Sequence, residues 1–105
     1  MVSGAKIEQA ARLLASRASS PARVILFGSH ARGEADRASD VDFLVIEAEV
    51  DDRFAEIVRL TAALAEIRMP ADVLVVSEEH VAEWGEVPGT MLSSALKEGR
   101  LVAQA

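Results

Sequence analysis

Three short apolar runs alternate with segments of helical periodicity along this chain, and that alternation limits its fold more than any other feature. The runs cover residues 24–27, 40–46 and 71–76, and the last is rich in β-branched side chains, which favour strands. Segments with helical spacing or helix-start signals separate the runs. We therefore expect an α/β fold of the α+β kind, with a small mixed sheet packed with helices.

Apolar stripes and capping residues mark the first two long helices. The first spans about 5–19, and the second begins where Asp51 and Asp52 can accept hydrogen bonds from free backbone N–H groups. Pro70 ends the second helix, because the residue before a proline avoids helical backbone. The expected stripes are Ile7, Ala10, Ala11, Leu14 and Ala18 in the first helix, and Phe54, Ile57, Val58, Thr61, Leu64 and Ile67 in the second.

Shorter helices are predicted elsewhere in the chain. Residues 29–33 are placed to begin one between the first two strands, and Ser77, followed by two glutamates, is typical of a helix start. A last helix is expected over about 90–98, with Gly99 as a left-handed C-terminal cap. No repeat, low-complexity tract or linker interrupts the sequence, so we expect a single domain over residues 1–105.

Composition excludes several classes of site and partner. The chain has no cysteine, which rules out disulfides, thiolate metal sites and cysteine nucleophiles. No apolar run approaches the roughly 20 residues that span a bilayer, and no signal segment is visible, so we expect no membrane partner and a cytoplasmic protein. The net charge of −6 disfavours a long nucleic acid as partner, although a metal could still hold a small anion.

The stretch FGSHARGEADRASDVDFLV, residues 27–45, carries the first chemical signal. Gly28 lets the backbone turn sharply and lets a ligand come close, and the helix expected to begin at Ser29 offers free N–H groups to an anion. This arrangement is typical of a phosphate-binding turn. The alternative is an ordinary strand-to-helix turn that Ser29 merely caps.

Two aspartates inside an apolar run are the second signal. Strand alternation would place Asp40 and Asp42 on one face, where the two carboxylates repel each other unless a cation lies between them. Magnesium suits such a site, since it takes one or two protein carboxylates and fills its shell with water and substrate phosphate. The alternative is that both aspartates lie on a solvated edge.

Asp72 begins the next predicted strand, which can lie beside the strand that carries Asp42. Its carboxylate would then reach the same end of the sheet. Three carboxylates opposite a phosphate-binding turn are typical of a two-metal site for phosphoryl or nucleotidyl transfer, with Asp72 as base or orienter of the incoming hydroxyl. The alternative is a simple strand-edge residue after Pro70.

Taken together, the Gly28-Ser29 pair, ten intervening residues, Asp40-Val41-Asp42 and the later Asp72 resemble the signature of the DNA polymerase β-type nucleotidyltransferase superfamily. At this length the whole chain resembles its minimal branch, the MNT or MntA-type proteins. The segment PGTMLSSALKEGRLV is similar to their closing helix. The resemblance implies the polymerase β-like nucleotidyltransferase fold.

The resemblance also implies an enzyme that uses a nucleoside triphosphate, usually ATP, with Mg²⁺. Carried over by position, Gly28 and Ser29 would hold the β- and γ-phosphates, and Asp40 and Asp42 would bind the metals. Asp72 would complete the catalytic and metal-binding carboxylates. Arg32 lies one helical turn on from Ser29, where it could touch phosphate, or it could be an ordinary exposed arginine.

The partner is implied by the same resemblance. MntA-type proteins are often antitoxins paired with a HEPN-domain ribonuclease toxin, and the family activity transfers AMP from ATP to a tyrosine of the toxin. An acidic surface suits a protein partner better than a nucleic acid. Two alternatives stay open, a non-catalytic module that masks a toxin and a nucleotide-binding regulator without transfer.

Overall fold

A computed structural model describes residues 3–33 and 40–105 of the chain. The elements begin as the sequence predicts, with a helix before the first strand. In chain order they are α1 (Gly4–Arg17), β1 (Ala22–Phe27), α2 (Ser29–Arg32), β2 (Asp42–Glu47), α3 (Arg53–Glu66), β3 (Asp72–Ser77), α4 (Glu78–Trp84), α5 (Met91–Glu98) and β4 (Arg100–Gln104). The expected α/β architecture with a small mixed sheet is confirmed.

The four strands form one sheet in the order β3-β2-β1-β4. β1 is antiparallel to both β2 and β4, whereas β2 and β3 run parallel. Two register pairs matter for the site, because Phe27 lies opposite Asp42 and Asp42 lies opposite Asp72. The end of β1 and the starts of β2 and β3 therefore meet at one edge of the sheet.

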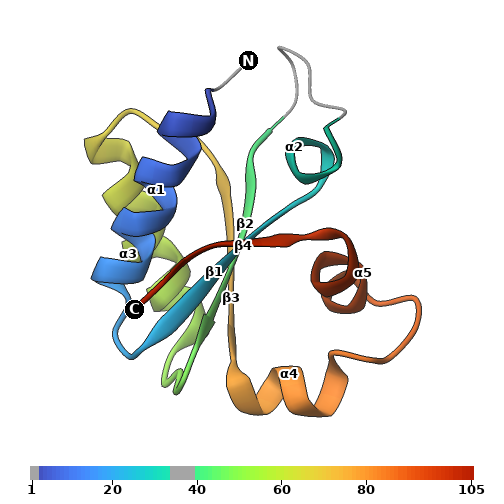
Figure 1. Cartoon of the computed structure of the whole chain (residues 1–105). Helices are drawn as coiled ribbons and strands as arrows, with labels where there is room; N and C mark the ends of the chain where they lie inside the picture. The colour runs from blue at the N-terminus through green and yellow to red at the C-terminus, as the bar shows by residue number, and fades with distance from the viewer. Residues whose placement is uncertain (1–2, 34–39) are drawn as a thin grey trace.

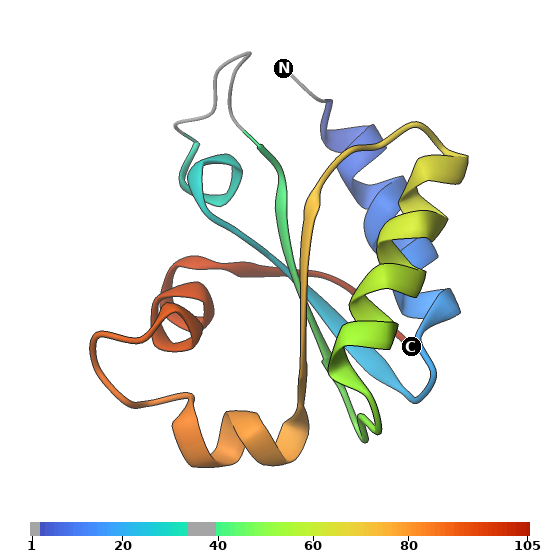
Figure 2. The same ribbon diagram turned by 180° about the vertical axis from the view of Figure 1, so that it is seen from behind.

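Helices cover both faces of this sheet (Figures 1 and 2). α1 and α3 pack side by side on one face, where the larger core cluster includes Leu14, Phe43 and Leu64. α4 and α5 lie against the other face, where a smaller cluster includes Ile25 and Leu44. None of the helices in the described ranges is both long and apolar enough to cross a membrane.

The apolar stripe expected on α3 is confirmed only in part, because Leu64 is buried and Ile57 and Ile67 pack partly against the core, whereas two other members are exposed. Phe54 and Val58 are 77% and 68% exposed, so the side that carries them faces solvent. The helix instead buries Glu56, Leu60, Ala63 and Leu64. Docking against α1 and β3 buries the ridge of Leu60 and Leu64, and Phe54 and Val58 on the opposite side stay in water.

The chain beyond α5 also differs from expectation. Gly99 has φ −76° and ψ 166°, which is extended backbone rather than a left-handed cap. It leads directly into β4, a strand that the sequence did not reveal. A Cβ at Gly99 would collide with the carbonyl oxygen of Ala95, so this glycine is needed for close packing and not for its handedness.

Candidate active site

Gly28 forms a sharp corner between β1 and α2. Its φ of 77° and ψ of −157° lie in a region that is open essentially to glycine alone. Its carbonyl oxygen accepts hydrogen bonds from the backbone N–H groups of Ala31, at 3.1 Å, and Arg32, at 3.2 Å. A Cβ on Gly28 would collide with Oδ2 of Asp42. The turn and the first residue of β2 are therefore in direct contact.

Asp42 and Asp72 are the first residues of two neighbouring parallel strands. They are register partners, and the backbone N–H of Asp72 donates to the carbonyl oxygen of Val41 at 2.9 Å. Asp42 is partly buried and Asp72 is exposed. The predicted adjacency of these two strands is thus what brings the two carboxylates to one edge.

The pKa of Asp42 is affected by its acidic neighbours. Its pKa is raised above the ordinary value by partial burial first, and then by the negative charges of Asp72 and Asp40 and by hydrogen bonding with Asp72. The charge of His30 acts in the opposite direction. Like charges disfavour ionisation, so a cation beside Asp42 would relieve this repulsion.

Asp40 lies just before β2 rather than inside it, which corrects the expected strand start. The residue is exposed, and its effect on the pKa of Asp42 shows that the two carboxylates are electrostatic neighbours. Strand alternation therefore does not place Asp40 on the same sheet face as Asp42.

These residues fit a divalent cation by their chemistry. Carboxylate oxygens are the ligands that magnesium prefers, and the absence of a side chain at Gly28 leaves room for the Asp42 carboxylate to lie against the turn. Over residues 3–33 and 40–105, no three His, Cys, Asp or Glu side chains are already gathered into a metal-binding cluster. The aspartates form a shared acidic neighbourhood rather than a closed coordination shell.

Ser29 is the first residue of α2, and Gly28 holds the cap position without a side-chain hydrogen bond. The structure thus disfavours the alternative in which Ser29 serves only as a helix cap. Its side chain is partly exposed beside the Gly28 corner, where the sequence predicts phosphate binding.

Arg32 ends α2, and its Nη1 donates to Oε2 of Glu98 at 3.2 Å. This ion pair links α2 to α5, with both side chains close to half exposed, at 41% and 50%. Arg32 therefore has a structural role in the described chain, and contact with phosphate stays a prediction.

His30 directly follows Ser29, and the sequence favours it as an ordinary surface histidine rather than a residue of the site. A lone histidine without a ligand-spaced companion is usually a surface residue. The structure places its charge close enough to lower the pKa of Asp42 against the effect of the other aspartates. Its position directly after Ser29 is the signal that could have marked it.

The chain is similar to known proteins in sequence pattern and in fold. A family model described as a nucleotidyltransferase domain matches residues 7–102. One chain of a crystal structure of a toxin–antitoxin with AMP-PNP matches in fold with a TM-score of 0.57 and 22% identity, covering 99% of this chain and 75% of that one. A chain of a mutant MntA–HpeT toxin–antitoxin complex matches with a TM-score of 0.61 and 21% identity, covering 100% of this chain and 75% of that one. No curated protein matches the chain.

At these identities the solved structures establish a shared fold. The sheet and helices described above are therefore arranged as in the matched chains of these two complexes.

Proposed function

Because the chain belongs to the nucleotidyltransferase domain family, we propose that it is an antitoxin that transfers AMP from ATP to a tyrosine of a HEPN-type toxin. The observation that carries the proposal is the register pairing of Asp42 with Asp72 against the Gly28 corner. The MntA–HpeT complex and the AMP-PNP complex of related fold support a toxin partner and an adenine nucleotide.

In this proposal the residues of the chain divide the work between binding and proton transfer. Gly28 and Ser29 hold the β- and γ-phosphates, because backbone N–H groups at a helix start favour anions. Asp40, Asp42 and Asp72 hold Mg²⁺, and when bound it offsets the negative charge of the phosphates and stabilises the attacking and leaving oxygens. Arg32 adds a positive charge near the phosphates.

The transfer step balances without a further reactant. The hydroxyl oxygen of the acceptor attacks the α-phosphorus of ATP and forms a new P–O bond. The bond between that phosphorus and the bridging oxygen breaks, and pyrophosphate leaves. The hydroxyl proton passes to the Asp72 carboxylate, which is exposed and can return it to solvent.

The acceptor must belong to another protein if it is a tyrosine, since the chain contains none. A phenol is a suitable acceptor because its reference pKa of about 10 is lower than that of an aliphatic hydroxyl. Turnover on tyrosine therefore requires a partner.

The test combines labelled ATP with Mg²⁺, the wild-type chain or Asp42→Asn, and a candidate HEPN toxin. We expect label on a toxin tyrosine with the wild type, and at least a hundredfold less with Asp42→Asn. The variant should melt at the same or a slightly higher temperature, because its removal of charge relieves repulsion from Asp72 and Asp40.

Three results would contradict parts of this proposal. Label only on RNA or on a small hydroxylated compound would point to another branch of nucleotidyltransferases. Tight toxin binding without any label would favour a masking module. Transfer at the wild-type rate by Asp42→Asn would remove Asp42 from the catalytic site.

A further inference from the structure

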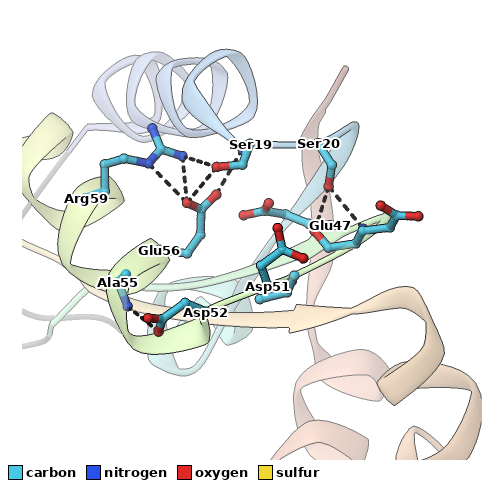
Figure 3. A pocket seen from close by; sticks show the side chains of 10 residues that line it. Ser19, Ser20, Glu47, Asp51, Asp52, Ala55, Glu56 and Arg59 are labelled. Carbon is cyan, nitrogen blue, oxygen red and sulfur yellow. Dashed lines mark hydrogen bonds and ion pairs between the residues drawn. The ribbon is translucent and has the colours of Figure 1, made fainter.

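A polar cavity lies at the opposite end of β2 from Asp42 (Figure 3). It has a volume of about 340 Å³ and lies between the turn after α1, the loop after β2 and the first turns of α3. Glu47 is the last residue of β2 and Asp42 the first, so the two ends are about 17 Å apart at roughly 3.3 Å per residue. The cavity is therefore separate from the candidate active site.

Glu47 is the unusual residue of this cavity. It is fully buried, with 0% of its surface exposed, and it forms part of the cavity lining. As a carboxylate it has no hydrogen-bond partner for either oxygen, and the adjacent Glu56 carboxylate becomes a partner only when Glu47 is protonated. A buried carboxylate without a partner is costly, and either a proton or a bound cation can offset that cost.

The neighbouring Glu56 cannot supply a cation, because it is itself a carboxylate and can only share a proton with Glu47. Its Oε2 accepts from the backbone N–H of Ser19 at 2.9 Å, and its Oε1 accepts from the Ser19 hydroxyl at 2.9 Å and from Nη2 of Arg59 at 2.7 Å. Nη2 of Arg59 also donates to the Ser19 hydroxyl at 3.0 Å. The guanidinium of Arg59 thus donates its hydrogen bonds to Glu56 and Ser19, and it acts on Glu47 only through its charge.

The cavity carries a large excess of negative charge. Its described lining holds a single guanidinium, that of Arg59, against five carboxylates, which are those of Glu47, Glu49, Asp51, Asp52 and Glu56. Figure 3 shows that Glu47, Asp51 and Glu56 come from three different segments around the same space. An excess of this kind attracts a cation.

The size and geometry of the cavity favour an organic cation over a metal ion. The volume is several times the roughly 30 Å³ that one water occupies, which is more than a bare ion needs. No three acidic side chains of the described ranges, those of this cavity included, are close enough together to hold a metal. A guanidinium suits the site best, since it is weakly hydrated and can donate two parallel hydrogen bonds to one carboxylate.

We propose that this cavity binds a guanidinium or primary ammonium group, with the Glu47 carboxylate as its principal acceptor. The group can come from a free diamine or guanidino compound or from an arginine side chain of a partner protein. In either case the bound cation supplies the counter-charge and the hydrogen-bond donors that Glu47 lacks. Asp51, exposed at the cavity, contributes a second negative charge.

The affinity should depend on pH, because a proton competes with the cation for Glu47. Burial first, then a hydrogen bond with the Glu56 carboxylate and the negative charge of that group, raise the pKa of Glu47 to about 7, against the opposing effects of the Ser20 backbone and Arg59. The other charged groups that face it are Glu49, Asp51 and Asp52 in the loop after β2. Cation binding should therefore release a proton near neutral pH and tighten as the pH rises from 6 to 8.

The test is a titration of the full chain with agmatine, which carries a guanidinium and an ammonium, followed by amide NMR and calorimetry. We expect shifts in the amides of Ser19, Ser20 and Glu56, and an affinity at pH 8 that falls roughly tenfold or more in Glu47→Gln. Asp51→Asn should weaken binding less. Glu8→Gln, an exposed change on α1, is the matched control and should bind as the wild type does.

Further arms identify the source of the cation and allow the proposal to fail. A blocked Gly-Arg-Gly peptide that binds as well as agmatine indicates a protein side chain, whereas binding of agmatine alone indicates a free compound. Equal affinity of the wild type and Glu47→Gln, or amide shifts confined to another surface, would overturn the proposal. Binding of Ca²⁺ or Mg²⁺ at this cavity in place of agmatine would also overturn it.

Discussion

Gly28 and Asp42 depend on each other at the scale of single residues. The space that a side chain at Gly28 would fill is taken by the Asp42 carboxylate, and the backbone of Gly28 has a conformation that other residues avoid. Two separate physical reasons therefore require glycine at this corner. The backbone conformation concerns the stability of the chain, and the contact with Asp42 concerns the proposed chemistry.

Gly28→Ala is expected to abolish nucleotide transfer and to lower the free energy of unfolding by about 1–3 kcal/mol from backbone strain. The added methyl group also forces the Asp42 carboxylate to move. Gly33→Ala is the matched control, because Gly33 has a φ of 73° but a Cβ there would meet nothing within 4 Å. It should lose stability by roughly 1–2 kcal/mol and keep its transfer activity. Equal loss of activity per folded molecule in both variants would contradict a role for the contact with Asp42.

Glu47 gives a second residue-scale prediction, which concerns stability and pH. The folded state raises the pKa of Glu47 from 4.5 to about 7, so the folded chain holds this proton more tightly than the unfolded chain does. Stability from this proton is fully present below pH 4.5 and is lost as the pH rises to about 7. Glu47→Gln should not show this loss of stability with rising pH, because a glutamine side chain does not titrate.

We therefore compare the free energy of unfolding of Glu47→Gln with that of the wild type at pH 4 and at pH 8. The difference should favour the variant more at pH 8, by roughly 1–3 kcal/mol. Urea denaturation of both proteins at the two pH values measures the difference. Burial alone would raise the pKa of Glu56, but Glu47, Ser19 and Arg59 together lower it to about 2, so Glu56 stays ionised over this range. A stability difference that is the same at both pH values would show that Glu47 keeps an ordinary pKa.

At the scale of elements, α5 and β4 depend on a close approach at Gly99. A Cβ there would collide with the Ala95 carbonyl oxygen and lie 2.9 Å from the Leu26 carbonyl oxygen. The helix end and β1 are both fixed backbone and cannot yield as a flexible side chain would. Gly99 is therefore a packing requirement for the strand that follows it.

Gly99→Ala should lower the free energy of unfolding by about 1–3 kcal/mol, as overpacking does elsewhere. Gly4→Ala serves as control, since a Cβ at Gly4 meets nothing within 4 Å, and it should be neutral or slightly stabilising in its helix. Chemical denaturation of the two variants compares them. A neutral Gly99→Ala would show that α5 and β1 can separate without cost.

The elements that the sequence predicted well are those with strong, unambiguous patterns. The stripe of α1 and the apolar runs of β1, β2 and β3 appear where expected. β4 was missed because it is short, lies at the sheet edge and is only partly buried, so its residues carry little apolar signal. On α3, only docking against its neighbours decides which apolar side is buried.

The candidate site likewise has features that the sequence indicates and features that only the structure shows. The sequence indicated that the strands of Asp42 and Asp72 can lie side by side, and the structure has the two residues as register partners. The contact of Gly28 with Asp42 and the influence of His30 depend on three-dimensional placement that no spacing reveals. Glu47 is a further case, because a glutamate at the end of an apolar run gives no sign in sequence of being buried without a partner.

At the scale of the whole molecule, the candidate active site and the Glu47 cavity occupy opposite ends of one central strand. β2 joins them and is paired on both sides. Effects of changes that share no neighbours and lie more than about 10 Å apart are usually additive. The two proposed ligands should therefore bind independently.

We expect the increases in melting temperature caused by ATP with Mg²⁺ and by agmatine to add when both are present, since each ligand stabilises the folded state by mass action. Asp42→Asn should reduce only the first increase and Glu47→Gln only the second. Differential scanning fluorimetry over the four ligand combinations makes the comparison. A combined shift well below the sum would reveal coupling through β2.

The parallel pairing of β2 with β3 also sets the order in which the molecule can become active. Antiparallel β1 and β2 bring Gly28 and Asp42 together, but Asp72 joins them only when α3 has crossed the sheet and β3 has docked. Pairings between segments distant in the sequence form slowly, because chain entropy is lost before the contacts compensate for it. A chain in which only β1 and β2 have paired therefore has the Gly28 corner and Asp42 but lacks Asp72 beside them. Recovery of transfer activity during refolding should follow the slowest structural phase.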